Sequence, residues 1–159
     1  MRRGPDVDVY RYVLFLDFDG FTYRGRELIE LDAREDVRLD AEGLKVTSVT
    51  ANGRPLEFSQ DGQGVTVRTG RFSGVLELEF TGEAAERLVG IYRAKYGDEY
   101  YISTQFESVH ARKMFPCIDN PAYKARFKLT VRIPRDLHAI SNMPIERVTI
   151  EGDKKVVEF

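Results

Sequence analysis

The feature that most constrains this chain is an alternation of apolar and polar residues with a period of two. Residues 124–133 read KARFKLTVRI, in which every second residue from Ala125 to Ile133 is apolar. The residues between them are basic or Thr. Successive side chains of a strand point to opposite faces, so the pattern predicts a strand with one buried and one solvated face.

The same alternation recurs at short intervals along the chain. In GVLELEFTG, the residues Leu76, Leu78 and Phe80 alternate with glutamates. Another strand signal is the pair Asn52-Gly53, which favours a tight hairpin turn with positive φ. Strands that follow one another about every 8–12 residues indicate a β-sandwich or a saddle-like sheet.

Only two short segments, residues 84–88 and 110–115, read as helix. The sequence therefore predicts an all-β, mainly antiparallel fold: a saddle-like β-sandwich with one or two short helices. With 159 residues and no linker-like or low-complexity tract, we expect residues 1–159 to form a single domain.

Composition narrows the environment and the partners. The net charge is -2, and both signs are mixed along the chain, so neither nucleic acid nor a membrane is expected as a partner. No apolar run approaches the roughly 20 residues of a membrane span. The single cysteine, Cys117, fits a reducing cytoplasm, and scarce Asn and Gln beside abundant Glu and Arg are typical of thermophiles.

One stretch suggests an enzyme of a different class. Residues 13–22, VLFLDFDGFT, approach the Asp-x-Asp signature of haloacid-dehalogenase-like phosphotransferases, with Asp17 as nucleophile and Asp19 as acid and base. That fold needs strands alternating with helices, and the following residues read as a second strand. The sequence therefore favours a turn between two strands, where Asp and Gly are expected.

The cysteine and the two histidines give little indication of a catalytic or metal site. Cys117 lies among apolar residues without an evident partner base, and such thiols are usually packing residues. The only histidines, His110 and His138, are too few for a zinc site, which typically takes three protein ligands even in an enzyme. No metal site is expected in this chain.

A longer block carries more information. The segments GIYRAKY, TQFE, AR, FPCIDNPAYKA and SNMP follow one another in this order at residues 90–96, 104–107, 111–112, 115–125 and 141–144. This block resembles the N-terminal domain of the zinc aminopeptidases related to aminopeptidase N, leukotriene-A4 hydrolase and the tricorn-interacting factors. In this resemblance DFDG becomes the turn of the family's first hairpin. Three positions depart from the family pattern: Ala94, His110 and Asn120.

The resemblance implies a role for two residues. The Glu of the family's Gln-x-Glu binds the free α-ammonium of the peptide, and here that residue is Glu107. Gln105, two residues earlier, should share its strand face and line the pocket for the first side chain. Leukotriene-A4-hydrolase-like members carry Gln at the Glu107 position, so Glu107 favours a plain aminopeptidase. Glu107 and Gln105 are thus expected to bind peptide substrate.

The family's zinc motif, His-Glu-x-x-His, does not occur in these residues. The resemblance therefore implies an N-terminal part of a longer, zinc-dependent aminopeptidase, inactive and metal-free by itself. Its partners would be peptides with a free N-terminus and the enzyme's own catalytic domain. The alternative interpretation is a stand-alone, non-catalytic β-sandwich binding module.

Overall fold

The computed structural model describes residues 7–159, and nearly all regular structure in them is strand. One 3-10 helix, η1 (Ala111–Lys113), interrupts the strands. The strands are β1 (Val7–Asp19), β2 (Thr22–Ala33), β3 (Val37–Asp40), β4 (Lys45–Ala51), β5 (Arg54–Pro55), β6 (Phe58–Gln60), β7 (Gly64–Val67), β8 (Phe72–Glu83), β9 (Gly90–Tyr96), β10 (Glu99–Gln105), β11 (Arg126–Pro134), β12 (Arg147–Glu151) and β13 (Lys154–Glu158).

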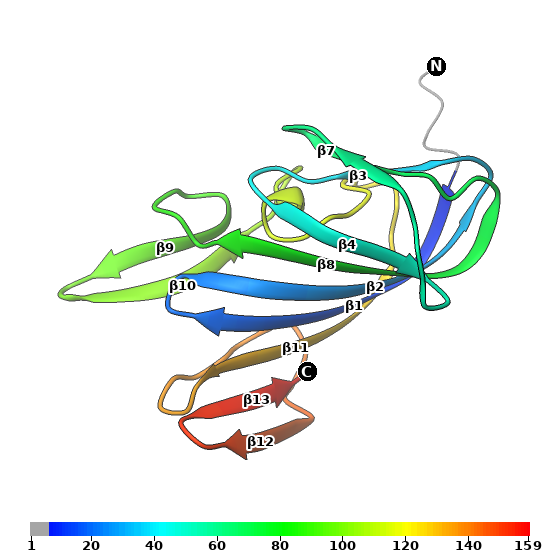
Figure 1. Cartoon of the computed structure of the whole chain (residues 1–159). Helices are drawn as coiled ribbons and strands as arrows, with labels where there is room; N and C mark the ends of the chain where they lie inside the picture. Colours follow the sequence, from blue (N-terminus) through cyan, green and yellow to red (C-terminus); the bar gives the residue numbers. More distant parts are fainter. Residues whose placement is uncertain (1–6) are drawn as a thin grey trace.

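Eight strands form one large sheet in the order β12-β13-β11-β1-β2-β8-β4-β5 (Figure 1). Only the pairing of β1 with β11 is parallel, and every other neighbouring pair in this sheet is antiparallel. The mainly antiparallel all-β fold expected from the sequence is confirmed. The turn at Asn52-Gly53 also forms as predicted, with positive φ at both residues.

Two smaller sheets complete the fold. Strands β3, β7 and β6 form a three-stranded sheet, and β9 and β10 form a two-stranded ribbon that extends beyond the large sheet in Figure 1. Between Val7 and Phe159 no helix has the length and apolar character that crossing a membrane requires.

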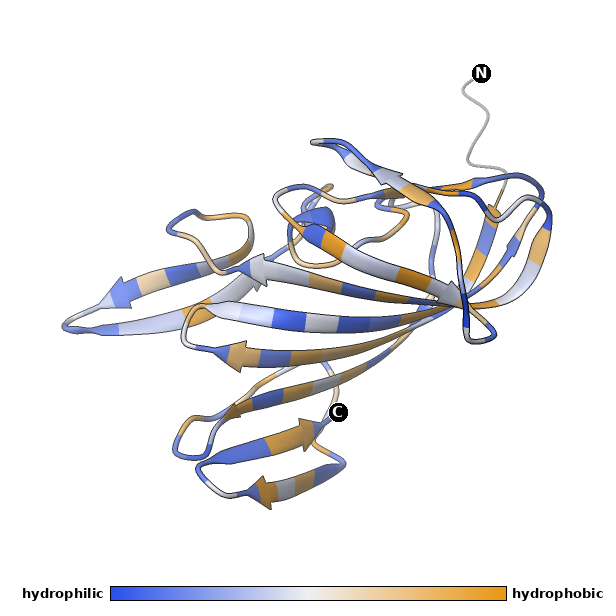
Figure 2. Cartoon of the chain, in the orientation of Figure 1, coloured by the Kyte–Doolittle hydropathy of each residue, from blue (hydrophilic) through white to orange (hydrophobic). Residues whose placement is uncertain are grey.

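Hydrophobic and hydrophilic residues alternate along strands of the large sheet (Figure 2), and the burial pattern of β8 places the core on one face of this sheet. Leu76, Leu78 and Phe80 of β8 are almost completely buried. They share one apolar cluster with residues of the three-stranded sheet, such as Leu39 and Val65. Full burial of such a side chain contributes about 1.5–3 kcal/mol.

Three expectations are wrong in detail. Residues 84–88 are not helical: the N–H of Ala84 donates to the carbonyl of Phe21 at 2.7 Å, and Ala85 forms a β-bridge with Tyr92. The predicted inner face of β11 is buried only at Val131 and Ile133, since Phe127 is 56% exposed. The helix at residues 110–115 shrinks to η1.

Candidate functional site

The chain turns sharply after β10, and this turn presents Glu107. β10 ends at Gln105, and the N–H of His110 donates to the carbonyl of Phe106 at 2.9 Å. η1 follows at once. Glu107 is therefore on a turn between a strand and a helix, with a cis peptide bond to Ser108.

Glu107 borders a hollow of about 250 Å³. The walls combine apolar and aromatic side chains with a polar rim. They are formed by Tyr12, Phe106, Glu107, Ser108, Ala111, Phe115, Cys117, Ile118, Asp119, Asn120, Pro121, Tyr123 and Phe127. Within residues 7–159 no hydrogen bond or ion pair engages the exposed carboxylate of Glu107. The hollow thus presents one carboxylate, available to a cation, beside an aromatic wall.

The prediction that Gln105 and Glu107 share one strand face is wrong. Both residues are exposed, but β10 ends at Gln105, so Glu107 does not continue its strand face. Gln105 pairs with Gly90 of β9 and is not part of the wall of the hollow. The two side chains leave the backbone from different local structures.

A largely buried ion pair fixes Asp119, one of the residues that line the hollow. The backbone N–H and the Nε of Arg112 each donate to the same Asp119 oxygen at 3.0 Å. The Arg112 side chain also lies 3.6 Å from Asp40, which accepts the backbone N–H of Asp119 at 3.0 Å. Asp40 and Cys117 exchange two backbone hydrogen bonds. The segment that carries Glu107 is therefore fastened to the end of β3.

Aromatic rings form the wall next to Glu107. Tyr12 of β1 stacks on Phe127 of β11 with ring centroids 5.0 Å apart, and Phe115 meets both rings edge-on. The hydroxyl of Tyr12 accepts the N–H of Ile118 at 3.0 Å, and burial raises the pKa of this phenol. The parallel pairing of β1 with β11 brings Tyr12 and Phe127 together, so sequence spacing could not reveal the wall.

Residues 7–159 match the family model described as Peptidase M1 N-terminal domain. The chain belongs to this family. Probable aminopeptidase 2 of Sulfurisphaera tokodaii is 52% identical over 156 residues, which cover 96% of this chain and 20% of that protein. Leucyl aminopeptidase of Saccharolobus solfataricus is 54% identical over 157 residues, with the same two shares. These archaeal sources fit the thermophile expected from composition.

This M1 N-terminal domain therefore spans about one fifth of the length of the curated relatives it matches. Tricorn protease-interacting factor F2 of Thermoplasma acidophilum is 40% identical over 159 residues, again 20% of its length. The crystal structure of the M1 zinc metallopeptidase from Deinococcus radiodurans has a TM-score of 0.81 at 23% identity. It covers 98% of this chain, whereas the chain covers 39% of it, and it supports the fold.

Two departures from the family pattern are accommodated locally in this M1 domain. Asn120 accepts the N–H of Ala122 at 3.0 Å with its side-chain oxygen, a typical Asx turn. His110 precedes η1, and its buried Nδ1 has no hydrogen-bond partner among the described residues. Neither side chain belongs to a candidate metal site. Within residues 7–159 no three His, Cys, Asp or Glu side chains are grouped to hold a metal ion.

Asp17 is an ion-pair residue of the M1 domain's outer sheet face. Its carboxylate lies 3.3 Å from the Arg132 guanidinium and 3.2 Å from the Lys154 ammonium. Asp19 ends β1, where its carbonyl accepts the hydroxyl of Thr22 at 3.0 Å. The hairpin turn expected at DFDG is confirmed, and the phosphotransferase interpretation has no α/β scaffold here.

Cys117 is the packing residue that the sequence predicted. Its thiol is almost fully buried, and burial raises its pKa well above the ordinary value. Sequence reasoning missed a second buried group, Glu27 of β2, whose carboxyl oxygens have no hydrogen-bond partner among the described residues. The alternation along β2 could have indicated its burial, because Glu27 lies on the same strand face as the buried Tyr23 and Ile29.

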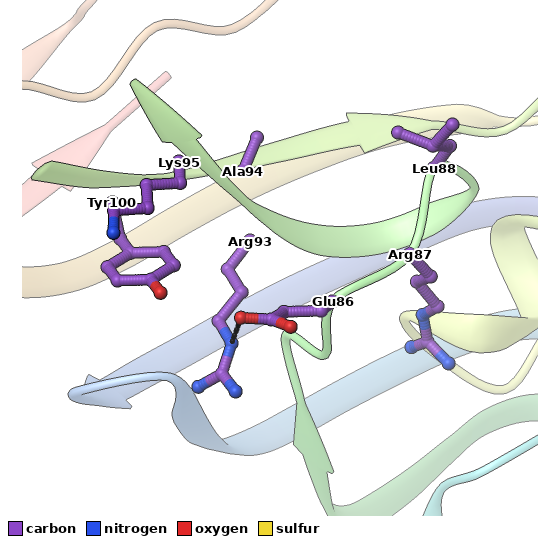
Figure 3. A pocket seen from close by; sticks show the side chains of 7 residues that line it. All are labelled: Glu86, Arg87, Leu88, Arg93, Ala94, Lys95 and Tyr100. Atoms are coloured by element: carbon purple, nitrogen blue, oxygen red, sulfur yellow. Dashed lines mark ion pairs between the residues drawn. The ribbon is translucent and has the colours of Figure 1, made fainter. Parts of the chain in front are cut away.

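A second hollow of about 500 Å³ lies beside β9 (Figure 3). Its residues are Glu86, Arg87, Leu88, Arg93, Ala94, Lys95 and Tyr100. The Arg93 guanidinium is 4.9 Å from the ring centroid of Phe21 and 3.7 Å from the Glu86 carboxylate. The Phe21 contact attaches the β9–β10 ribbon to the turn between β1 and β2, and the Glu86 contact attaches it to the segment between β8 and β9. The sequence did not suggest this role.

Proposed function

We propose that this domain recognises the free α-ammonium of peptide substrates for a zinc-dependent aminopeptidase that removes N-terminal residues. Glu107 is the anchor. The observation that carries the proposal is the exposed Glu107 carboxylate, without a partner among the described residues, at the mouth of an aromatic hollow. Membership in the M1 N-terminal family and the names of the relatives support it.

The chemistry requires such a group. An enzyme that removes one residue must identify the chain end, and the ammonium is the mark that internal peptide bonds lack. A charge-assisted hydrogen bond to a carboxylate contributes about 1.5–3 kcal/mol. The ion pair of Arg112 and Asp119, called the clamp below, supports this role because it fixes the segment that follows Glu107.

Gln105 has a separate part in the proposal. It is exposed at the end of β10, two residues before the anchor. A side-chain amide there can donate to or accept from the first residue of a peptide whose ammonium Glu107 holds. We assign it to the pocket for the first side chain.

Zinc does not fit the residues of this domain, since the described residues offer no donor cluster. The metal, the general base and the stabilisation of the transition state would come from the rest of a longer protein, in keeping with the one-fifth coverage of the relatives. That catalytic part and peptides are the proposed partners, and the cytoplasm is the proposed location.

The test is made in an aminopeptidase that contains this domain. Glu107→Ala should lower kcat/KM for amino-acid p-nitroanilides about 10- to 100-fold, given the strength of such a bond. Glu57→Ala, at an exposed carboxylate between β5 and β6, is the matched control and should change nothing. An unchanged rate for Glu107→Ala would remove the anchor role.

The alternative, a stand-alone binding module, gives a different result. The 159-residue chain would then bind leucine amide through Glu107 without any catalytic partner. Loss of this binding in Glu107→Ala, together with an unchanged kcat/KM in the longer enzyme, would favour the module.

A further inference from the structure

The strand β12 forms one edge of the eight-stranded sheet, and among residues 7–159 only β13 pairs with it (Figure 1). All five residues of β12 are exposed. An edge strand presents a row of backbone N–H and C=O groups to solvent, and these groups can pair with another strand. Natural sheets usually protect such edges.

β12 carries a charge at each end but lacks the proline that blocks the opposite edge. β5 has two residues, and one of them is Pro55, which cannot donate a hydrogen bond. β12 reads RVTIE, with no proline and no lysine, and it pairs with β13 residue by residue. The sheet is therefore open to strand addition at one edge.

The sequence of β12 is complementary to itself in the antiparallel sense. A two-fold axis through Thr149 would place Arg147 opposite Glu151 of a second copy, and Val148 opposite Ile150. Opposite charges and β-branched pairs are both favourable across antiparallel strands. The same pairs recur on both sides of the axis, as a two-fold interface requires.

The backbone has the matching register. The turn at Gly152-Asp153 joins β12 to β13, so Glu151 and Lys154 form the closing pair of the hairpin. Alternation along an antiparallel ladder then directs the N–H and C=O of Val148 and Ile150 outward. These are the two residues that face each other across the proposed axis.

Charge and apolar exposure support a second copy as the partner. Arg147 and Glu151 are paired within the chain, with Glu158 at 3.6 Å and with Arg132 of β11 at 3.0 Å, but their side chains remain 73% and 49% exposed. Val148 and Ile150 are about half exposed, and the segment that leads into β12 exposes Ile145 as well. Pairing would cover the flanks of these apolar side chains.

We propose that two copies of this chain associate through β12, antiparallel about Thr149, into one continuous sheet. The contact is small, so the dimer forms at high concentration and dissociates on dilution. The proposal is independent of Glu107 and of peptide binding.

Sedimentation velocity of the 159-residue chain tests it, from about 10 μM to about 1 mM, the range where small interfaces associate. The expected result is a shift from monomer to dimer. Val148→Pro should abolish the shift because it removes an outward donor, and edge positions tolerate proline. Val148→Thr, which keeps the donor and the β-branched shape, is the matched control and should retain the dimer.

Charge reversal identifies the geometry. Arg147→Glu alone and Glu151→Arg alone each place like charges opposite one another. Each variant should therefore dimerise at least about tenfold more weakly than the wild type. An equimolar mixture of the two variants restores both charge pairs and should form a heterodimer. The antiparallel register about Thr149 predicts both the weakening in each single variant and the rescue in the mixture.

Three results would overturn the proposal. One is a monomer at every concentration. Another is a dimer that Val148→Pro leaves intact. The third is a mixture of the charge variants that associates no better than either variant alone.

Discussion

Arg112 donates two hydrogen bonds to one carboxylate oxygen of Asp119, from its backbone N–H and from its side-chain Nε, both at 3.0 Å. The Asp119 side chain is only 9% exposed. This arrangement closes the loop that follows Glu107 and attaches it to Asp40. The stability of the candidate site therefore depends on one largely buried pair.

Asp119→Ala should lower the free energy of unfolding by about 3 kcal/mol, since it leaves a partly buried guanidinium without its main partner. Urea denaturation measures this difference. Glu57→Ala is the control, because Glu57 and Arg68 form an exposed pair 3.9 Å apart that should contribute about 0–1 kcal/mol. Equal losses in the two variants would contradict a special role for the clamp.

Glu27 predicts how stability depends on pH. Burial raises the pKa of its carboxyl well above the ordinary 4.5, so the folded state keeps a proton that the unfolded state releases above that pH. The stabilisation is complete below pH 4.5 and is lost as pH rises towards the folded-state pKa, by about 1.4 kcal/mol per pH unit.

Glu27→Gln isolates this effect from other titrating groups. The difference in unfolding free energy between the wild type and this variant should shift in favour of the variant as pH rises above 4.5. Denaturation series at several pH values provide the comparison. The groups nearest in electrostatic terms are Tyr12 and Cys117, both neutral in this range because burial raises their pKa values. A difference independent of pH would show that Glu27 is charged in the fold.

Gly25 predicts a steric cost in the core. A Cβ at this position would lie 2.2 Å from the ring of Phe80, which packs directly over the β2 backbone. Gly25→Ala should therefore destabilise the domain by about 3 kcal/mol, the upper range for overpacking. Gly62→Ala serves as the control, because nothing lies within 4 Å of its Cβ. Thermal unfolding of the two variants should separate clearly.

Cys117 should resist thiol reagents in the folded protein. Its pKa is raised by burial, and the thiolate is the reactive form. Ellman's reagent should label it only as fast as the domain unfolds. Ser59→Cys, at an exposed position of β6, should react at once in the folded state. Rapid labelling of the wild type under native conditions would contradict the packing role.

Strands such as β8 were predictable because the period-two pattern is a local property of the sequence. β8 and the Asn52-Gly53 hairpin formed as that local pattern indicated. The aromatic wall was not predictable, since Tyr12 and Phe127 meet through pairing between segments distant in the chain. For the same reason the exposure of Phe127 and the bridge at Ala85 contradicted local expectations.

The candidate site divides in the same way. Glu107 could be chosen from its motif, and in the structure it lines a hollow. Its relation to Gln105 could not, because nothing local in TQFES marks the end of β10 at Gln105. The clamp between Arg112 and Asp119 needs the fold of the intervening loop to bring the charges together.

The parallel pairing of β1 with β11 also sets an order of events during synthesis. β1 leaves the ribosome early, but its partner on that side is far downstream: Asp17 and Arg132, which meet across the two strands, are 115 residues apart. Until β11 emerges, one flank of β1 has no neighbour in the middle of the future sheet. Contacts of such long range slow folding. That flank of β1 is therefore among the last parts of the sheet's centre to be covered as the chain is made.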